Sequence, residues 1–109
     1  MKKENRIKKS EEFQKIIRKR RTVTNLTFVL YYNKKNEEKA RIGISMSKKM
    51  GNAVIRNKIK RQLRMMIQET INFNQLEMDA IIIAKAKFKE QSYDVNKKDL
   101  ERLIKTVKI

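Results

Sequence analysis

The sequence predicts one α+β domain, an α/β sandwich with a four-stranded sheet and the element order α-β-β-β-α-β-α. Residues 26–32 and 40–47 alternate apolar and polar or small side chains with the period of a β-strand. Residues 80–84 form a short apolar run typical of a central, buried strand. Residues 53–71 repeat apolar side chains at helical intervals. Because no repeat, linker or shift in composition divides the chain, residues 1–109 are predicted to form a single domain.

The N-terminal region is predicted to contain an arm and a helix. Residues 1–9 are polar and basic, and we expect them to form a mobile arm. Ser10 can cap a helix whose first turn carries Glu11 and Glu12, which the helix dipole favours there. The basic run 18–21 ends this helix. It either matches the negative end of the dipole or makes a contact to phosphate, and the sequence leaves both interpretations open.

The two longer predicted strands follow a brief extended stretch at Val23, and each has one apolar face. The apolar faces consist of Leu26, Phe28, Leu30, Tyr32, Ala40, Ile42, Ile44 and Met46. The opposite face combines aromatic and small side chains, namely Val29, Tyr31, Gly43, Ser45 and Ser47. Bases of single-stranded nucleic acid stack on such a surface. The alternative is that the first helix covers this face and that Tyr31 is ordinary packing.

Residues 48–64 are the most distinctive part of the chain, because they carry seven cations and no acid. Asn52 is a plausible cap for a helix that continues to about Ile71. Its apolar stripe is Ile55, Ile59, Leu63, Met66 and Ile67. The outward positions pair like charges four residues apart, which costs roughly 0.2–0.5 kcal/mol per pair. A merely solvated face usually mixes Glu with Lys, so this helix predicts a site for a polyanion.

The C-terminal third is predicted to contain the buried strand, a loop and a last helix. Residues 85–94 are expected to form the loop. The helix is expected to begin near Asn96, with Val95 and Leu100 forming a hydrophobic staple around its cap. The strand–helix–strand unit around the basic helix should pair in parallel, and the general rule would make this crossover right-handed.

Composition narrows the class of function. A net charge of +17 on 109 residues favours nucleic acid as the partner, with an acidic membrane surface as the alternative. No segment is apolar enough to span a bilayer, and we see no signal peptide. The chain has no His and no Cys, which argues against protein-borne catalysis or metal binding and is consistent with a cytoplasmic location.

Three consecutive motifs resemble the signature of the bacterial ribonuclease P protein subunit. They are Ser45-Met-Ser-Lys-Lys49, Gly51-Asn-Ala-Val54 and Arg56-Asn-Lys-Ile-Lys-Arg61 followed by Arg64. The family's Arg-Asn-Arg element reads Arg56-Asn57-Lys58 here, which keeps the charge and loses one guanidinium. The similarity also covers 6–13, 25–31 and 41–44, and thus nearly the whole chain.

The resemblance implies an accessory protein of a catalytic RNA that removes the 5′ leader from precursor tRNA. It implies a rare left-handed crossover at the basic helix, and chemistry performed with Mg²⁺ held mainly by the RNA. No catalytic or metal-binding residue and no obligate protein partner are expected on this chain. The expected partners are the catalytic RNA and precursor tRNA.

The resemblance also assigns two sets of residues. Contacts to the catalytic RNA are expected at Lys48, Lys49, Asn52, Arg56, Asn57, Lys58, Lys60, Arg61 and Arg64. Contacts to the leader are expected at Phe13, Ile17, Val29, Tyr31 and Ser45. Two positions depart from the family: Ile17 stands where an aromatic residue is frequent, and Arg20 where glycine is common after the first helix. A ribosomal or RNA-assembly protein is the alternative function, whereas a DNA-binding regulator and an intrinsically active nuclease are less consistent with the sequence.

Overall fold

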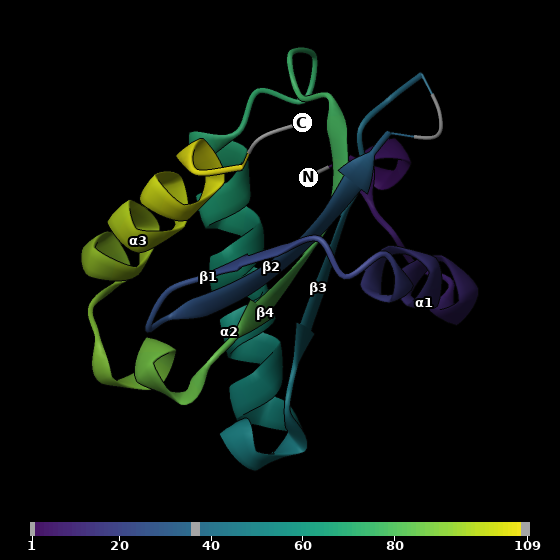
Figure 1. The fold of residues 1–109 in the computed structure, drawn as a ribbon. Helices are drawn as coiled ribbons and strands as arrows, with labels where there is room; N and C mark the ends of the chain where they lie inside the picture. The colour runs from purple at the N-terminus through teal and green to yellow at the C-terminus, as the bar shows by residue number, and fades with distance from the viewer. Residues whose placement is uncertain (1, 36–37, 108–109) are drawn as a thin grey trace.

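The computed structural model describes residues 2–35 and 38–107 and confirms the predicted α+β class and element order (Figure 1). The helices are α1 (Ser10–Arg18), α2 (Ala53–Thr70) and α3 (Tyr93–Lys105). The strands are β1 (Thr22–Thr24), β2 (Phe28–Lys34), β3 (Ile42–Met46) and β4 (Met78–Ala84). Short 3₁₀ helices occupy Lys3–Asn5, Lys48–Met50 and Ala86–Glu90.

The four strands form one mixed sheet in the order β1-β2-β4-β3. Strand β2 pairs antiparallel with both β1 and β4, and β3 pairs parallel with β4, as predicted for the unit that contains α2. The left hand of this crossover stays a prediction of the family resemblance. Because β4 is central and covered on both faces, its side chains are apolar on both, apart from Asp79 near its start.

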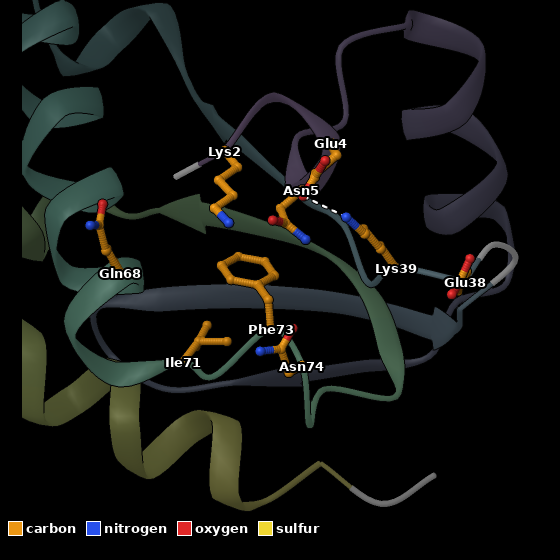
Figure 2. A pocket seen from close by; sticks show the side chains of 9 residues that line it. All are labelled: Lys2, Glu4, Asn5, Glu38, Lys39, Gln68, Ile71, Phe73 and Asn74. Carbon is orange, nitrogen blue, oxygen red and sulfur yellow. Dashed lines mark hydrogen bonds and ion pairs between the residues drawn. The ribbon is translucent and has the colours of Figure 1, made fainter.

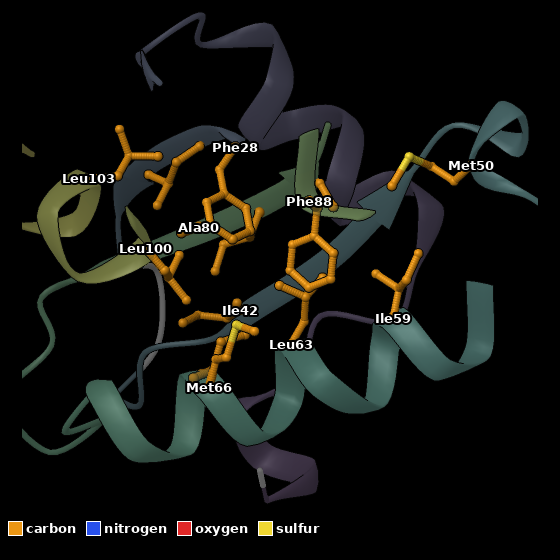
Figure 3. Close-up of a cluster of buried hydrophobic side chains, with 14 of the residues drawn as sticks. Phe28, Ile42, Met50, Ile59, Leu63, Met66, Ala80, Phe88, Leu100 and Leu103 are labelled. Atoms are coloured by element: carbon orange, nitrogen blue, oxygen red, sulfur yellow. The ribbon is translucent and has the colours of Figure 1, made fainter. Parts of the chain in front are cut away.

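The main core lies between the sheet and the two helices α2 and α3 (Figure 3). Phe28 and Leu30 of β2 and Ile42 of β3 are fully buried in it, as predicted. The prediction was wrong for Leu26, which precedes β2 and is 79% exposed. The stripe of α2 packs onto this face through Ile59, Leu63, Met66 and Ile67. Phe88 closes the core from the loop after β4, and its ring meets that of Phe28 edge-on at 5.8 Å.

Helix α1 packs on the opposite face of the sheet. Its Ile16 forms a smaller cluster with Ile81 of β4 and Ile7 of the N-terminal segment, and Phe13, Ile17 and Tyr31 surround this cluster. Arg41 fixes the helix at the edge of β3, because its guanidinium lies 2.8 Å from the carboxylate of Glu12. The sheet is therefore sandwiched between α1 and the pair α2 and α3.

Both ends of α2 agree with the sequence analysis. Asn52 caps the helix, since its Oδ1 accepts a hydrogen bond from the backbone N–H of Ile55 at 3.0 Å. The helix ends at Thr70, one residue before the expected end. Ile55 is the exception in the apolar stripe: it is 39% exposed and lies over Gly51, whose φ of 145° excludes a side chain.

Three local predictions were wrong. Residues 2–9 are not a mobile arm, because Ile7 is 5% exposed and its N–H donates to the carbonyl of Ile42 on the open edge of β3. Ser10 is the first residue of α1 and Lys9 occupies the cap position. Helix α3 begins three residues before Asn96 and is capped by Ser92, whose Oγ accepts from the N–H three residues on.

The expected staple at the start of α3 is absent as well. Val95 is 44% exposed, so it does not fix the entry of the helix. Asn96 is buried instead, and its side chain donates to the carbonyl of Phe88 at 2.9 Å. The loop before α3 is therefore held by a buried polar side chain rather than by an apolar contact.

Candidate nucleic-acid interface

The nine residues expected to contact the catalytic RNA lie on α2 and on the 3₁₀ turn before it, and we call them the basic face. Six are exposed, namely Lys48, Lys49, Asn52, Asn57, Lys58 and Arg61. Arg56, Lys60 and Arg64 are half-buried. Helical geometry places Arg61 opposite the buried stripe, so its side chain points farthest from the core. The structure brings all nine to one side of the molecule, outside the core.

The turn before α2 positions the first members of the basic face. The Oγ of Ser47 accepts from the backbone N–H of Lys49 at 3.1 Å and fixes the 3₁₀ turn. Asn52 uses its Oδ1 for the cap of α2, which leaves its Nδ2 as a hydrogen-bond donor. These caps fix the turn and hold Lys48, Lys49 and Asn52 at the start of the helix, where the helix dipole favours negative charge.

The protein does not neutralise this face with its own acids. Within residues 2–35 and 38–107, no Asp or Glu forms an ion pair with a cation of the basic face. The Nε atoms of Arg56 and Arg64 are enclosed and have no hydrogen-bond partner. An unsatisfied, buried charged donor is costly, and these two side chains would gain from rotating onto an external acceptor. The face thus has the electrostatics of a polyanion site.

Two features of this surface were not predicted from the sequence. Arg6 and Lys8 of the N-terminal segment line a hollow of about 130 Å³ together with Lys60 and Arg64, so four cations meet there. Val54 and Met65 are 76% and 59% exposed on α2, among the cations. The exposure of Val54 and Met65 could have been predicted, because both lie outside the apolar stripe of the helix. No pattern in the sequence predicted that the N-terminal segment packs beside α2.

The five residues expected at the leader, which we call the sheet surface, lie on the α1 side of the sheet. All five are half-buried: Phe13, Ile17, Val29, Tyr31 and Ser45. Strand pairing arranges their neighbours in two rows across the sheet. One row is Tyr31, Ile81 and Gly43, and the other is Val29, Ile83 and Ser45.

Helix α1 covers the first row and leaves the second more open. A Cβ placed on Gly43 would lie 2.6 Å from the ring of Phe13, so this ring rests directly on the glycine. Tyr31 packs beside Phe13 and Ile17 in the smaller cluster. Tyr31 therefore contributes to packing, and a surface of half-buried side chains remains beside the helix. Contact of this surface with single-stranded nucleic acid stays a prediction.

Ile83 belongs to the sheet surface although the sequence did not single it out. It lies between Val29 and Ser45 in the sheet register, so it forms the middle of the open row. Once the strand order is known, the alternation of side chains along β4 places Ile83 on the same face of the sheet as Val29 and Ser45. The apolar run 80–84 hid this assignment, because a central strand is apolar on both faces.

Metal-binding and membrane-spanning features are not found in the described part of the chain. Among these residues, no group of three or more His, Cys, Asp or Glu side chains is placed to hold a metal ion. No described helix combines the length and the apolar character needed to cross a bilayer.

The fold and the site define an α+β protein with a mixed four-stranded sheet and a basic helix whose cations pair with no described acid. The family model described as Ribonuclease P matches residues 1–108. The chain is 48% identical to the ribonuclease P protein component of Mesoplasma florum over 105 residues, which cover 95% of this chain and 96% of that protein. This chain belongs to the ribonuclease P protein family.

Solved structures agree with this assignment. A mutant RNase P protein from Staphylococcus aureus has a TM-score of 0.85 and 40% identity, covering 94% of this chain and 87% of that one. The RNase P protein from Thermotoga maritima has a TM-score of 0.82 at 24% identity, with coverage of 95% and 98%, and shows the shared fold.

Proposed function

We propose that this chain binds the catalytic RNA of ribonuclease P and the 5′ leader of precursor tRNA, and assists Mg²⁺-dependent endonucleolytic removal of that leader. The observation that carries the proposal is the basic face, whose seven cations form no ion pair with a described acid. A helix selected for stability alone would mix its charges, because like-charged neighbours destabilise it. This proposal places the protein in the cytoplasm with its RNA partners.

The basic face supports binding through the phosphate backbone of structured RNA. Lysine and arginine side chains neutralise phosphates and release counterions, which gives affinity with little dependence on base sequence. Arg6 and Lys8 extend this surface beyond α2, because they share a hollow with Lys60 and Arg64. The catalytic RNA would therefore contact the arm as well as the helix.

The sheet surface supports binding of the single-stranded leader. Its open row, Val29, Ile83 and Ser45, spans three neighbouring strands, or about 10 Å at the usual strand spacing. Tyr31 and Phe13 add aromatic rings at its border with α1, on which bases can stack. Contacts to the phosphate backbone and stacking on aromatic rings depend little on the base sequence. The protein would therefore accept leaders of many sequences.

The chemistry is assigned to the RNA. This chain lacks His and Cys, and its described carboxylates do not gather into a metal site. The residues present therefore do not fit a Mg²⁺ held by the protein alone, and we assign the ion mainly to the RNA. The protein would contribute by neutralising phosphates where the substrate meets the catalytic RNA.

Reconstitution tests the proposal directly. The purified protein should restore 5′ processing of precursor tRNA by ribonuclease P RNA at low Mg²⁺. If about six cations engage, the log–log salt dependence of RNA binding should have a slope of about −5. Failure to restore processing, or a slope near zero, would contradict the proposal.

The leader contact has its own test. Tyr31→Ala should weaken binding of precursor tRNA to the reconstituted holoenzyme more than binding of mature tRNA, because only the precursor carries a leader. An equal loss for both RNAs would remove the sheet surface from the proposal. It would leave the basic face untouched.

A further inference from the structure

A second pocket lies beyond the C-terminal end of the basic face and belongs to neither surface described above. It has a volume of about 460 Å³ and opens between the N-terminal segment, the end of α2 and the connection that follows it (Figure 2). Its lining includes Lys2, Asn5, Gln68, Ile71, Phe73 and Asn74. Segments far apart in the sequence thus converge on one concave site.

The floor of this pocket is apolar and includes an aromatic ring. Phe73 and Ile71 are half-buried and pack against the main core, which holds them in place. Figure 2 shows the Phe73 ring facing the open space, with the side chains of Lys2 and Asn5 directed toward it. A fixed aromatic surface of this kind stacks well with a flat heteroaromatic group.

The wall above the ring carries a hydrogen-bond acceptor. Asn5 is only 6% exposed, and its Nδ2 donates to the carbonyl of Ala40 at 2.8 Å. The Oδ1 of the same carboxamide is directed toward the open space of the pocket (Figure 2). An amide oxygen accepts hydrogen bonds, so this atom can accept from a donor on a ligand. The carboxamide of Asn74 lines the same space and can accept or donate.

The charge of the pocket differs from that of the basic face. Its lining contains two lysines and two glutamates, and the Nζ of Lys39 lies 2.7 Å from the carboxylate of Glu4 at the rim. The pocket is therefore neutral overall, in a protein of charge +17. A neutral, amide-lined and aromatic-floored site fits an uncharged base better than a phosphate.

Helix α2 connects this pocket to the cations. Gln68 follows Arg64 by one turn of the helix, which is about 6 Å along its axis. Residues four apart lie on the same side of a helix, so an RNA strand held by Arg64 would pass close to the pocket.

We propose that this pocket binds one unstacked nucleobase of the RNA that lies along α2, with the base on the Phe73 ring and a base N–H donating to the Oδ1 of Asn5. The inference rests on the proposed function, since it requires RNA on the basic face. The pocket would contact a base of the RNA, whereas the basic face would contact its phosphates.

The test uses the full-length protein labelled with ¹⁵N and three probes: adenosine 5′-monophosphate, ribose 5-phosphate and inorganic phosphate. The nucleotide should shift the amide signals of Asn5, Phe73 and Asn74, whereas the two probes without a base should not. Phe73→Leu should abolish these shifts, and Phe73→Tyr should preserve them because the ring is kept. Equal shifts with ribose 5-phosphate would overturn the proposal, as would shifts that survive in Phe73→Leu.

A second measurement relates the pocket to RNA binding. Phe73→Leu should weaken binding to ribonuclease P RNA by at least about fivefold, since a stacked base contributes about that much or more. The salt slope should stay unchanged, because no phosphate contact is lost. If Phe73→Leu unfolds, the exposed Asn74→Ala should still reduce the nucleotide-induced shifts. Unchanged RNA affinity with an intact salt slope would refute the pocket alone, whereas loss of the slope in the wild type would refute the proposed function.

Discussion

Arg61→Gln should have opposite effects on the free protein and on its RNA complex. Arg61 is exposed, points away from the core and forms no hydrogen bond or ion pair with another described residue. Glutamine has nearly the same helix propensity as arginine, so the substitution changes the charge with little effect on the backbone. It separates the role of the cation from that of the helix.

The magnitude for the free protein follows from the neighbours of Arg61 on α2. Lys58 and Arg64 lie three residues away on either side, so two like-charge pairs disappear. Each pair costs roughly 0.2–0.5 kcal/mol, and the variant should therefore be more stable by about 0.4–1 kcal/mol. This corresponds to a rise of a few degrees in Tm for a chain of this size.

The magnitude for the RNA complex follows from counterion release. Losing one phosphate contact lowers the salt slope by about one. A fourfold rise in salt would then weaken binding roughly 250-fold for the variant, compared with roughly a thousandfold for the wild type. Fluorescence polarisation of labelled ribonuclease P RNA, measured at four salt concentrations, gives both slopes.

Arg102→Gln is the matched control. Arg102 is also an exposed arginine, but it lies in the last turn of α3, away from the basic face. The control has the same substitution and the same net charge, and its stability should change by less than about 0.5 kcal/mol. If both variants lose the same part of the salt slope, RNA senses only the net charge of the protein. If Arg61→Gln melts at a lower temperature, its side chain has a structural role, and the reasoning fails.

Three further predictions concern the fold around the sheet surface and the helix junctions. Gly43→Ala should destabilise the protein by roughly 1–3 kcal/mol in urea denaturation, because the added methyl group would force the Phe13 ring outward. Arg20→Gly should stabilise it by up to about 1 kcal/mol in the same assay, because φ of Arg20 is 54°, a conformation that costs non-glycine residues more than glycine. Tyr93→Phe should flatten the dependence of Tm on pH at both extremes. Burial and the nearby Glu69 raise the pKa of Tyr93 to about 12, and the Tyr93 hydrogen bond lowers the pKa of Glu69.

Tyr93 and Glu69 affect the stability of the protein at opposite ends of the pH range. Tyr93 contributes stability below its ordinary pKa near 10, and this contribution is lost as the pH rises toward about 12. Glu69 contributes above its ordinary pKa of 4.5, and this part is lost as the pH falls through its lowered value. Parallel Tm profiles for the variant and the wild type would contradict the pairing. A more stable Gly43→Ala, or a less stable Arg20→Gly, would show that the respective strain is absent.

The parts of the fold that the sequence predicted correctly depend on local periodicity. Strands β2 and β3 and helix α2 each bury one regular face, so the alternation or the helical spacing reports which side chains enter the core. Asn52 is a cap that acts on its own helix, three residues away. Such features depend on neighbours in the sequence, which a pattern can show.

The wrong predictions concern residues whose partners no periodicity indicates. Asn96 resembles a cap, but its carboxamide bonds to Phe88 and to Gln91 in the preceding loop, and Gln91 also contacts Thr27 of the segment before β2. Ile7 is one apolar residue in a basic segment, and it is buried because it packs at the open edge of β3. The partner of Ile7 cannot be identified before the strand order is known, and the partners of Asn96 depend on how the loop after β4 folds.

The distribution of the acids explains why the basic face was nonetheless predictable. Glutamates are used where the chain joins its own elements: Glu12 ties α1 to Arg41 beside β3, and Glu69 ties α2 to Lys97 of α3. Glu69 lies beyond the last cation of the basic face, so the acid-free stretch of the sequence ends where α2 forms an ion pair with α3. A stretch without acids therefore marks a surface whose positive charge the protein does not neutralise with its own carboxylates. This feature is visible in a short segment of the sequence, even though the partner is another molecule.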